Sequence, residues 1–323
     1  MIIACDINRG QIAKPVDSSP RLVEMFTGCY LPNRIGGVIL VTGGTGFIGR
    51  SLTEVLKQEN RPYKIYRGRI DDSLVLRAQL VDVDAVVHLA SAESRNQIRL
   101  LQRVDVEGTE SLLKECRLSG VRRIIVISRL SANPNSHFAL LRAKGLVERQ
   151  IIESGIPYTL VRSATLFGRD DRFLNVIAGL AAWSWPFVWV PGKGRVALQP
   201  LWVEDLVRCL VACLDRTDLV GETIELAGAE RIRYAEIVRQ VMLTAGMRRV
   251  AISPGIKLVR PISMLLFGWW RHPPVTRFAM DRYSVPEVAP LDSVLRYFGF
   301  QPSRLGQRVA YLRRSHPGLA LLR

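Results

Sequence analysis

The chain has 323 residues, of which 48% are hydrophobic and 23% charged, so it is long enough to bury the large core of a globular protein. Lysine and arginine number 45 against 29 acidic residues, and the net charge of +16 favours anionic partners such as phosphates, nucleic acid, acidic proteins or anionic lipid. Five scattered cysteines exclude a disulfide framework, and the lack of any Lys/Arg-rich tract argues against nucleic-acid binding.

The first 37 residues predict a loosely ordered tail. They contain three prolines and no sustained hydrophobic period, and charged residues interrupt the apolar run that a signal peptide needs. With so few cysteines, this pattern predicts a cytoplasmic protein with reduced thiols. Cys209 and Cys213 lie one helical turn apart with no histidine nearby, which indicates a helix face, and no metal site is expected.

Residues 38–50 read VILVTGGTGFIGR, a buried-strand pattern that leads directly into three spaced glycines and a helix beginning near Phe47. Gly43 suits a tight turn, Gly46 lets the backbone approach a pyrophosphate, and Gly49 lets the helix pack against its strand. The helix start would direct free amides and its positive dipole end at the phosphates. Strand, turn and helix in this order predict an NAD or NADP site. The residues expected to contact the dinucleotide here are Gly43, Thr45, Gly46, Phe47, Ile48, Gly49 and Arg50.

Strands and helices alternate as far as Gly168, which predicts an α/β fold with a doubly wound, Rossmann-type parallel sheet. Only one strand–helix unit fits between the first helix and the strand Ala85–Leu89, so the sheet should lack one unit of a full nucleotide-binding half. The other strands are expected at Tyr63–Arg67, Arg123–Ile127 and Tyr158–Arg162. The helices are expected at Arg50–Glu59, Ser73–Leu80, Val104–Ser119 and Phe138–Ser154.

Beyond Gly168 the alternation ends, and the remaining chain predicts a smaller, mostly helical C-terminal region. A helix at Val203–Leu214 and a strand at Thr223–Leu226 are expected to return to the main sheet. The predicted organisation is a tail at 1–37, a dinucleotide-binding domain at 38–168 and a C-terminal region at 169–323, of which 199–228 rejoins the sheet.

The position of the ribose-binding acid, about 20 residues beyond the glycines, falls within the segment 67–71. Arg67 and Arg69 stand there, and Arg50 directly follows the last glycine, which favours a 2′-phosphate and therefore NADP. Asp71 or Asp72 could instead bind the ribose or adenine of NAD. The arginines could also be solvated turn residues.

The sequence resembles the extended and atypical short-chain dehydrogenase/reductase superfamily, and the closest branch is the Rossmann-fold accessory subunit of respiratory complex I and its bacterial relatives. The glycine turn marks the superfamily, whereas the segments Phe167–Asn175 and Gln199–Asp205 are specific to the branch. Further likeness lies in His88–Ala90, Val106–Thr109 and Glu225–Gly228. The resemblance implies coenzyme contacts at Leu89, Ala90, Ser91, Lys144 and Arg162.

Active members of this superfamily carry a Tyr-x-x-x-Lys pair on the helix that follows the strand bearing a serine. The lysine lowers the tyrosine pKa and holds the nicotinamide ribose, while the tyrosine exchanges a proton with the substrate oxygen. Lys144 has the expected place and Ser128 ends the strand, but Leu140 replaces the tyrosine. Losing a positioned acid typically costs ~10²–10⁴ in rate. Ser128 could equally be a turn residue, and Lys144 an exposed helix lysine.

Two further positions bear on the resemblance. Ser163 and Ala164 stand where the family usually has a proline touching the nicotinamide, which weakens the case for hydride transfer. Asp205 is expected to cap or brace its helix rather than touch a ligand.

Two apolar stretches, 176–190 and 256–274, together contain five of the six tryptophans. Both contain proline, and the first would reach only ~22 Å as a helix, so neither is expected to span a bilayer. Tryptophan beside arginine suits an interfacial segment on anionic lipid. The alternatives are a pocket lining with a core helix, or a protein–protein contact.

Two functions therefore remain. The first is a catalytically weak or silent NADP-binding protein that serves a membrane-bound respiratory or redox complex, peripheral on the inner face of the membrane. The second is an NADP-dependent oxidoreductase or epimerase acting on a lipid-like or isoprenoid substrate. A nucleic-acid role would explain the charge alone.

Overall fold

The computed structural model describes residues 36–253, 265, 275–281 and 284–313, all within one compact unit. The predicted tail therefore lies outside the described residues, apart from Gly36 and Gly37. The division at residue 168 remains a prediction.

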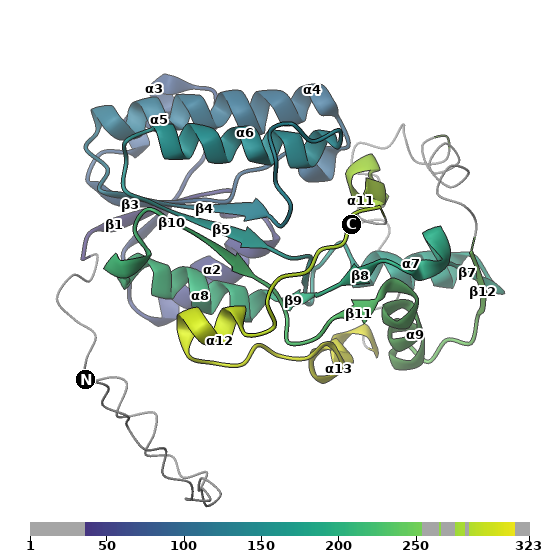
Figure 1. The fold of residues 1–323 in the computed structure, drawn as a ribbon. Helices are drawn as coiled ribbons and strands as arrows, with labels where there is room; N and C mark the ends of the chain where they lie inside the picture. Colours follow the sequence, from purple (N-terminus) through teal and green to yellow (C-terminus); the bar gives the residue numbers. More distant parts are fainter. Residues whose placement is uncertain (1–35, 254–264, 266–274, 282–283, 314–323) are drawn as a thin grey trace, which may run out of the picture. The chain divides into compact units, whose positions relative to one another are not determined.

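The centre of the fold is a six-stranded parallel sheet in the order β10-β5-β4-β3-β1-β2 (Figure 1). The predicted Rossmann-type sheet is thereby confirmed. The inner strands β1, β3 and β4 are rich in β-branched residues, which fits a sheet buried on both faces. The strands are β1 (Val38–Thr42), β2 (Tyr63–Ile65), β3 (Val83–His88), β4 (Arg123–Arg129), β5 (Tyr158–Ser163) and β10 (Glu222–Leu226).

The strand order also confirms the missing unit. In the described residues β2 forms the edge of the sheet, and the chain returns from it through a single helix to β3 on the other side of β1. The order reverses between β1 and β3, and the carboxyl ends of the strands at such a switch point form the crevice where doubly wound sheets bind ligands. The glycine turn follows β1 at this crevice.

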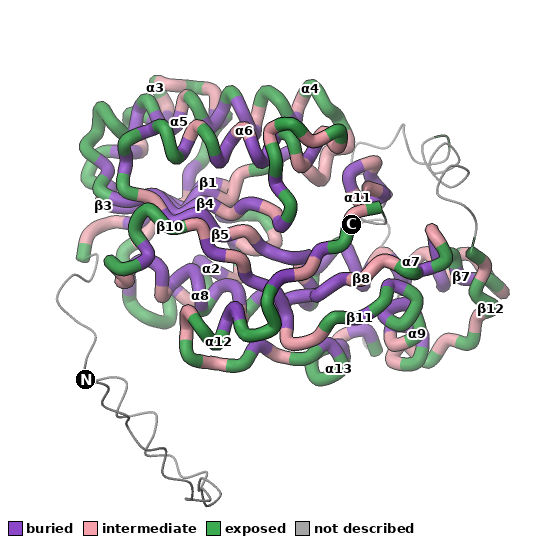
Figure 2. Tube along the Cα trace, viewed as in Figure 1, coloured by how far each residue is buried: buried purple, intermediate pink, exposed green. Residues whose placement is uncertain are grey.

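Helices cover both faces of the sheet (Figure 1). Alternate strand residues serve the two layers: Leu40 and Val86 pack toward one layer, and Ile39 and Val87 toward the other. Figure 2 shows the strands buried between helices that are exposed on their outer sides. One layer contains α3 (Ser73–Gln79), α4 (Ile98–Leu101), α5 (Gly108–Leu118) and α6 (Ala139–Glu153). The other contains α2 (Phe47–Gln58), α8 (Val203–Asp215) and α12 (Ser293–Phe298).

The helix predicted at Val104–Ser119 differs in its first turn, because η2 (Gln102–Glu107) is a π-helix that continues into α5. The wider turn buries Asp105, which is 1% exposed and engaged by polar groups of other elements. Hydrophobic periodicity cannot reveal such a turn, because the polar contacts that accompany the π-helix come from residues distant in the sequence.

The smaller region has its own core around Phe167, Trp202 and Ile237. Three two-stranded pairs join its segments: β6 with β9, β8 with β11, and β7 with β12. Its strands are β6 (Leu166–Phe167), β7 (Phe187–Trp189), β8 (Ala197–Leu198), β9 (Leu201–Trp202), β11 (Ile232–Arg233) and β12 (Val250–Ile252). Its helices are α7 (Leu174–Trp183), α9 (Tyr234–Thr244), α11 (Arg277–Asp281) and α13 (Leu305–Arg308). Short 3₁₀ turns occur at Glu93–Arg95, Pro191–Gly194, Thr217–Leu219 and Val309–Arg313.

Candidate functional site

The glycine turn has the geometry that the sequence predicts. Gly43 has φ +68°, and a Cβ there would lie 2.8 Å from the backbone of Leu89 and Ala90. A Cβ on Gly49 would lie 2.3 Å from the carbonyl oxygen of Gly43, so only glycine lets α2 approach the turn this closely. At Gly46 a Cβ would meet only that same oxygen, at 3.1 Å, and its other side faces the adjoining pocket.

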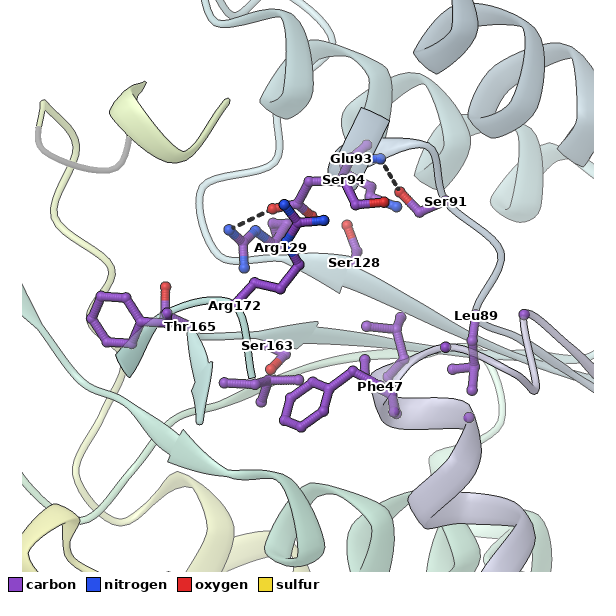
Figure 3. A pocket seen from close by; sticks show the side chains of 18 of the residues that line it. Phe47, Leu89, Ser91, Glu93, Ser94, Ser128, Arg129, Ser163, Thr165 and Arg172 are labelled. Atoms are coloured by element: carbon purple, nitrogen blue, oxygen red, sulfur yellow. Dashed lines mark hydrogen bonds and ion pairs between the residues drawn. The ribbon is translucent and has the colours of Figure 1, made fainter. Parts of the chain in front are cut away.

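A pocket of about 310 Å³ extends from the glycine turn across the carboxyl ends of the strands. Figure 3 shows Phe47 and Leu89 on one side of it, Ser128 and Ser163 in its middle, and Arg129, Arg172 and Thr165 beyond them. Of the predicted residues, those lining it are Gly43, Gly46, Phe47, Ile48, Gly49, Leu89, Ser91, Ser128 and Lys144. Thr45, Ala90 and Arg50 adjoin this wall, and Arg50 donates to the Thr45 carbonyl at 3.0 Å and pairs with Asp170 at 3.2 Å.

Ser128 and Lys144 both line this pocket. The Ser128 hydroxyl is fully buried and has no hydrogen-bond partner among the described residues. A buried polar atom left this way is costly unless a ligand or water completes it. The close-approach glycines and this hydroxyl together fit a nicotinamide dinucleotide.

Leu140 lies elsewhere. Its side chain is 3% exposed and lines a separate cavity of about 20 Å³, together with Phe278 of α11 and Leu130. The position four residues before Lys144 is therefore packed into the core, beside the covering helix α11. His137, the nearest polar alternative, is exposed before α6 and does not line the pocket.

A buried polar network underlies the pocket wall. Leu89 N–H donates to Thr42 Oγ1 at 3.2 Å, so the Thr42 hydroxyl is free to donate to His88 Nδ1 at 2.8 Å. His88 Nε2 then donates to Thr109 Oγ1 at 3.1 Å, and the Thr109 hydroxyl donates to the Asp105 carbonyl at 2.5 Å. Burial, with a smaller effect from Lys144, lowers the pKa of His88 to about 4, so the ring is neutral near pH 7.

In the segment predicted to bind the adenosine ribose, two arginines pair with one carboxylate. Arg69 holds Asp71 through two hydrogen bonds of 2.9 and 3.1 Å, and Arg103 of η2 donates to the same carboxylate at 2.8 Å. The hydrogen bond from Arg69 holds the pKa of Asp71 below its usual range. Arg67 is exposed nearby, and its backbone is held by Gln79. Arg103 is a site candidate that the sequence reasoning did not include.

Arg162 is placed away from the pocket. It forms two hydrogen bonds of 2.8 and 3.0 Å with Glu148 and approaches Glu225 at 3.6 Å. It lines a different groove, which also contains Ser293 and Tyr297. Because strand residues alternate between faces, Arg162 points away from the side that Ser163 presents to the pocket.

The family can now be assigned. The sequence profile of the NAD dependent epimerase/dehydratase family matches residues 39–227, from the first strand to the end of the main sheet. This chain belongs to that family.

Curated relatives extend the assignment. The mouse mitochondrial NADH dehydrogenase (ubiquinone) 1 alpha subcomplex subunit 9 is 26% identical, over 87% of this chain and 81% of its own length. A ceramide reductase from Caulobacter vibrioides is 27% identical, over 68% of this chain and 75% of its own length. Among solved structures, MoeE5 in complex with UDP-glucuronic acid and NAD shares the fold with a TM-score of 0.68 and 20% identity. The match covers 86% of this chain and 99% of the MoeE5 chain. The resemblance to the complex I accessory subunit, read from the sequence, is confirmed.

In this family member the far wall of the pocket comes from residues that the sequence reasoning missed. Arg129 pairs with Glu93 at 3.1 Å and approaches Glu287 at 3.7 Å, and Arg172, Phe173, Thr276 and Ala279 complete the wall. The branch-specific segment explains part of this arrangement, because Asp171 accepts the amides of Phe173 at 2.7 Å and Leu174 at 2.6 Å at the start of α7. Within the described residues no group of three His, Cys, Asp or Glu side chains is placed to hold a metal.

Asp205 accepts the backbone amide of Ser303 at 2.6 Å, which braces α8 against the C-terminal region. Cys209 and Cys213 are buried on one face of α8, and burial raises the pKa of Cys213 to about 12. Both thiols are therefore poor nucleophiles.

Proposed function

We propose that this family member binds NADP(H) tightly and retains it chiefly as a structural ligand, with weak or no turnover, while serving a membrane-bound respiratory or redox complex. The observation that supports the proposal is a pocket beside the glycine turn that is lined by Ser128 and Lys144, while position 140 is a leucine turned into a separate cavity. The coenzyme, when bound, would supply hydride chemistry, but no tyrosine stands in the expected place to exchange the proton. A retained ligand stabilises the fold by mass action.

The preference for NADP over NAD rests on the charges at the adenosine end. Arg69 and Arg103 bring two positive charges to the one carboxylate of Asp71, and Arg67 is exposed two residues before Arg69. A 2′-phosphate could replace Asp71 as the acceptor for these guanidinium groups, which bind phosphate through paired hydrogen bonds. NAD remains the alternative, with Asp71 then accepting from the ribose.

The proposed partners are subunits of a membrane-bound redox complex, as the names of the mouse, Arabidopsis and Neurospora relatives support. We place the protein on the inner face of the membrane, in the cytoplasm. No helix in the described part of the chain is long and apolar enough to cross a bilayer. The stretch 256–274 lies outside the described residues except for Leu265, which is 81% exposed.

The stretch 176–190 offers the surface for an anionic membrane. Trp183 and Trp185 are 76% and 74% exposed, while Phe187 and Trp189 point outward from β7 and the alternate residues Val188 and Val190 point inward. Exposed tryptophans of this kind suit the interfacial region of a bilayer. Lys193 and Arg195 follow this stretch in the sequence, and Arg248 comes two residues before β12, the strand that pairs with β7. The contact would be peripheral.

Flotation with vesicles of anionic lipid tests this surface. The wild-type protein should float with vesicles at low salt, and Trp183→Ala with Trp185→Ala should remain in the soluble fraction. Leu74→Ala, which removes an equally exposed apolar side chain on α3, should float like the wild type. Binding of wild type and double variant alike would remove this surface from the proposal, and binding to a purified partner complex without lipid would assign it to a protein contact.

Turnover assays test the catalytic part of the proposal. Protein purified without added coenzyme should retain NADP(H) or bind it, yet should not oxidise NADPH with carbonyl substrates beyond the background rate.

The second candidate is an NADP-dependent oxidoreductase or epimerase acting on a lipid-like or isoprenoid substrate. It is favoured by the extension of the pocket beyond Ser128 between Ile127, Leu166 and Phe173. Another group or water would then replace the tyrosine. Turnover of such a substrate by the purified protein, lost in Ser128→Ala, would establish this candidate instead.

A further inference from the structure

A single buried carboxylate organises two of the side chains that line the pocket. Asp105 accepts the Ser91 hydroxyl at 2.7 Å, the Ala92 amide at 2.8 Å and the Lys144 ammonium at 2.9 Å. Its side chain is 1% exposed and that of Lys144 is 9% exposed. Three separate elements therefore meet at this carboxylate: the turn after β3, the π-helical turn and α6.

The position of Asp105 is itself fixed from the glycine turn. Thr42, the residue before Gly43, begins a series of hydrogen bonds through His88 and Thr109. The series ends on the backbone carbonyl of Asp105. Every hydroxyl and ring nitrogen of that series has one consistent role as donor or acceptor. Movement of Asp105 would therefore break bonds that extend to the base of the coenzyme turn.

The Asp105 contact changes what Lys144 can do. The position from which a tyrosine would meet this lysine holds Leu140, whose side chain lies in the separate cavity. A buried ammonium needs an opposite charge, and Asp105 supplies it. Asp105 takes one of the three ammonium hydrogens, and no other described residue is seen to accept from Lys144. Two donors thus remain for a ligand in the pocket.

We propose that Asp105 is a positioning residue that holds Lys144 and Ser91 as a clamp for the two hydroxyls of the nicotinamide-side ribose. The clamp binds the sugar and moves no proton. This inference rests on the proposed coenzyme binding. It deepens that proposal by naming the carboxylate that positions the two side chains expected to bind the nicotinamide-side ribose. Ser91 lies on the pocket wall beside Glu93, whose amide donates to the Ser91 oxygen (Figure 3).

The test compares two ligands by isothermal titration calorimetry. NADP carries both riboses, whereas adenosine 2′,5′-bisphosphate carries only the adenosine half. Asp105→Asn should weaken NADP binding about tenfold and leave the bisphosphate unchanged within error, because the lost charge acts at one end only. Lys144→Met should do the same, and adding Asp105→Asn to Lys144→Met should cause a smaller loss than Asp105→Asn causes alone, because only the Ser91 contact is then left to change. Arg103→Ala serves as the matched control, since it should weaken the bisphosphate as well.

The outcomes separate this inference from the coenzyme proposal. Failure of the wild type to bind either ligand would refute coenzyme binding itself. If the wild type binds both ligands, two results for Asp105→Asn would overturn the clamp. One is an equal loss of affinity for NADP and for the bisphosphate, and the other is no loss of NADP affinity. Should Asp105→Asn fail to fold, Asp105→Glu keeps the charge and displaces it, and it should show the same loss for NADP alone. An unchanged NADP affinity in Asp105→Glu and Ser91→Ala would equally overturn the clamp.

Discussion

Acidification should destabilise this protein through the buried ring of His88. The ring is fully buried, and its pKa is about 4 against an ordinary 6.5. Below pH 6.5 the unfolded chain takes up a proton at this ring, whereas the folded protein does not until about pH 4. The unfolded state therefore binds more protons, and stability falls as the pH falls through this window. These two pKa values give a loss of about 2 kcal/mol between pH 7 and pH 5.

The variant His88→Gln isolates one group, because the pKa of Asp171 is raised by burial and its protonation in the folded state opposes the loss of stability through His88. Hydrogen bonds from arginines lower the pKa of Asp71, Asp218 and Asp292, so their stabilising effect is lost only below the ordinary carboxylate range. Urea unfolding of the wild type at intervals from pH 7 to pH 5 measures the slope. His88→Gln removes the ring and should remove most of that slope, whatever its stability at pH 7, while His137→Gln, at an exposed position, should keep it.

Equal slopes in the wild type and His88→Gln would refute the reasoning. So would a directly measured His88 pKa near 6.5 in the folded protein, followed by NMR of the ring protons. Either result would mean that the network from Thr42 to Asp105 does not exclude the charged ring.

Three further predictions concern the site. Gly49→Ala forces a Cβ to 2.3 Å from the Gly43 carbonyl and should abolish coenzyme binding in calorimetry, whereas Gly306→Ala, where nothing lies within 4 Å, should bind normally. Leu140→Tyr must enter a cavity of about 20 Å³ and should lose roughly 1–3 kcal/mol of stability in urea unfolding without gaining NADPH oxidation; a stable, active variant would contradict this packing. Arg103→Ala should weaken NADP several-fold more than NAD in paired titrations, while the exposed neighbour Arg99→Ala should not alter the ratio, and a ratio unchanged in both would exclude Arg103 from the 2′-phosphate site.

The central sheet was predictable because its signals are local. The apolar runs before Gly43 and around Val86 specify buried strands on their own, and the three glycine positions follow from steric requirements within one turn. The missing strand–helix unit could be recognised for the same reason, since it depends only on the length of chain between two apolar runs.

The pocket beyond the turn was less predictable, because its residues come from distant segments. Glu93, Arg129 and Arg172 come from three different segments of the chain, and the sheet order brings these segments to one wall. Arg162 shows the converse, because its place at a strand end suggested a coenzyme contact while the alternation of strand residues directs it to Glu148. Asp105 carried no sequence signal, since the π-helical turn that buries it is seen only in three dimensions.

Native mass spectrometry of the protein, purified gently from its own cells, tests the central claim most directly. The expected result is a mass increase equal to one NADP(H) per chain, which is lost on denaturation and absent in Gly49→Ala. A chain that carries no dinucleotide, and binds neither NADP nor NAD at millimolar concentration in calorimetry, would contradict it.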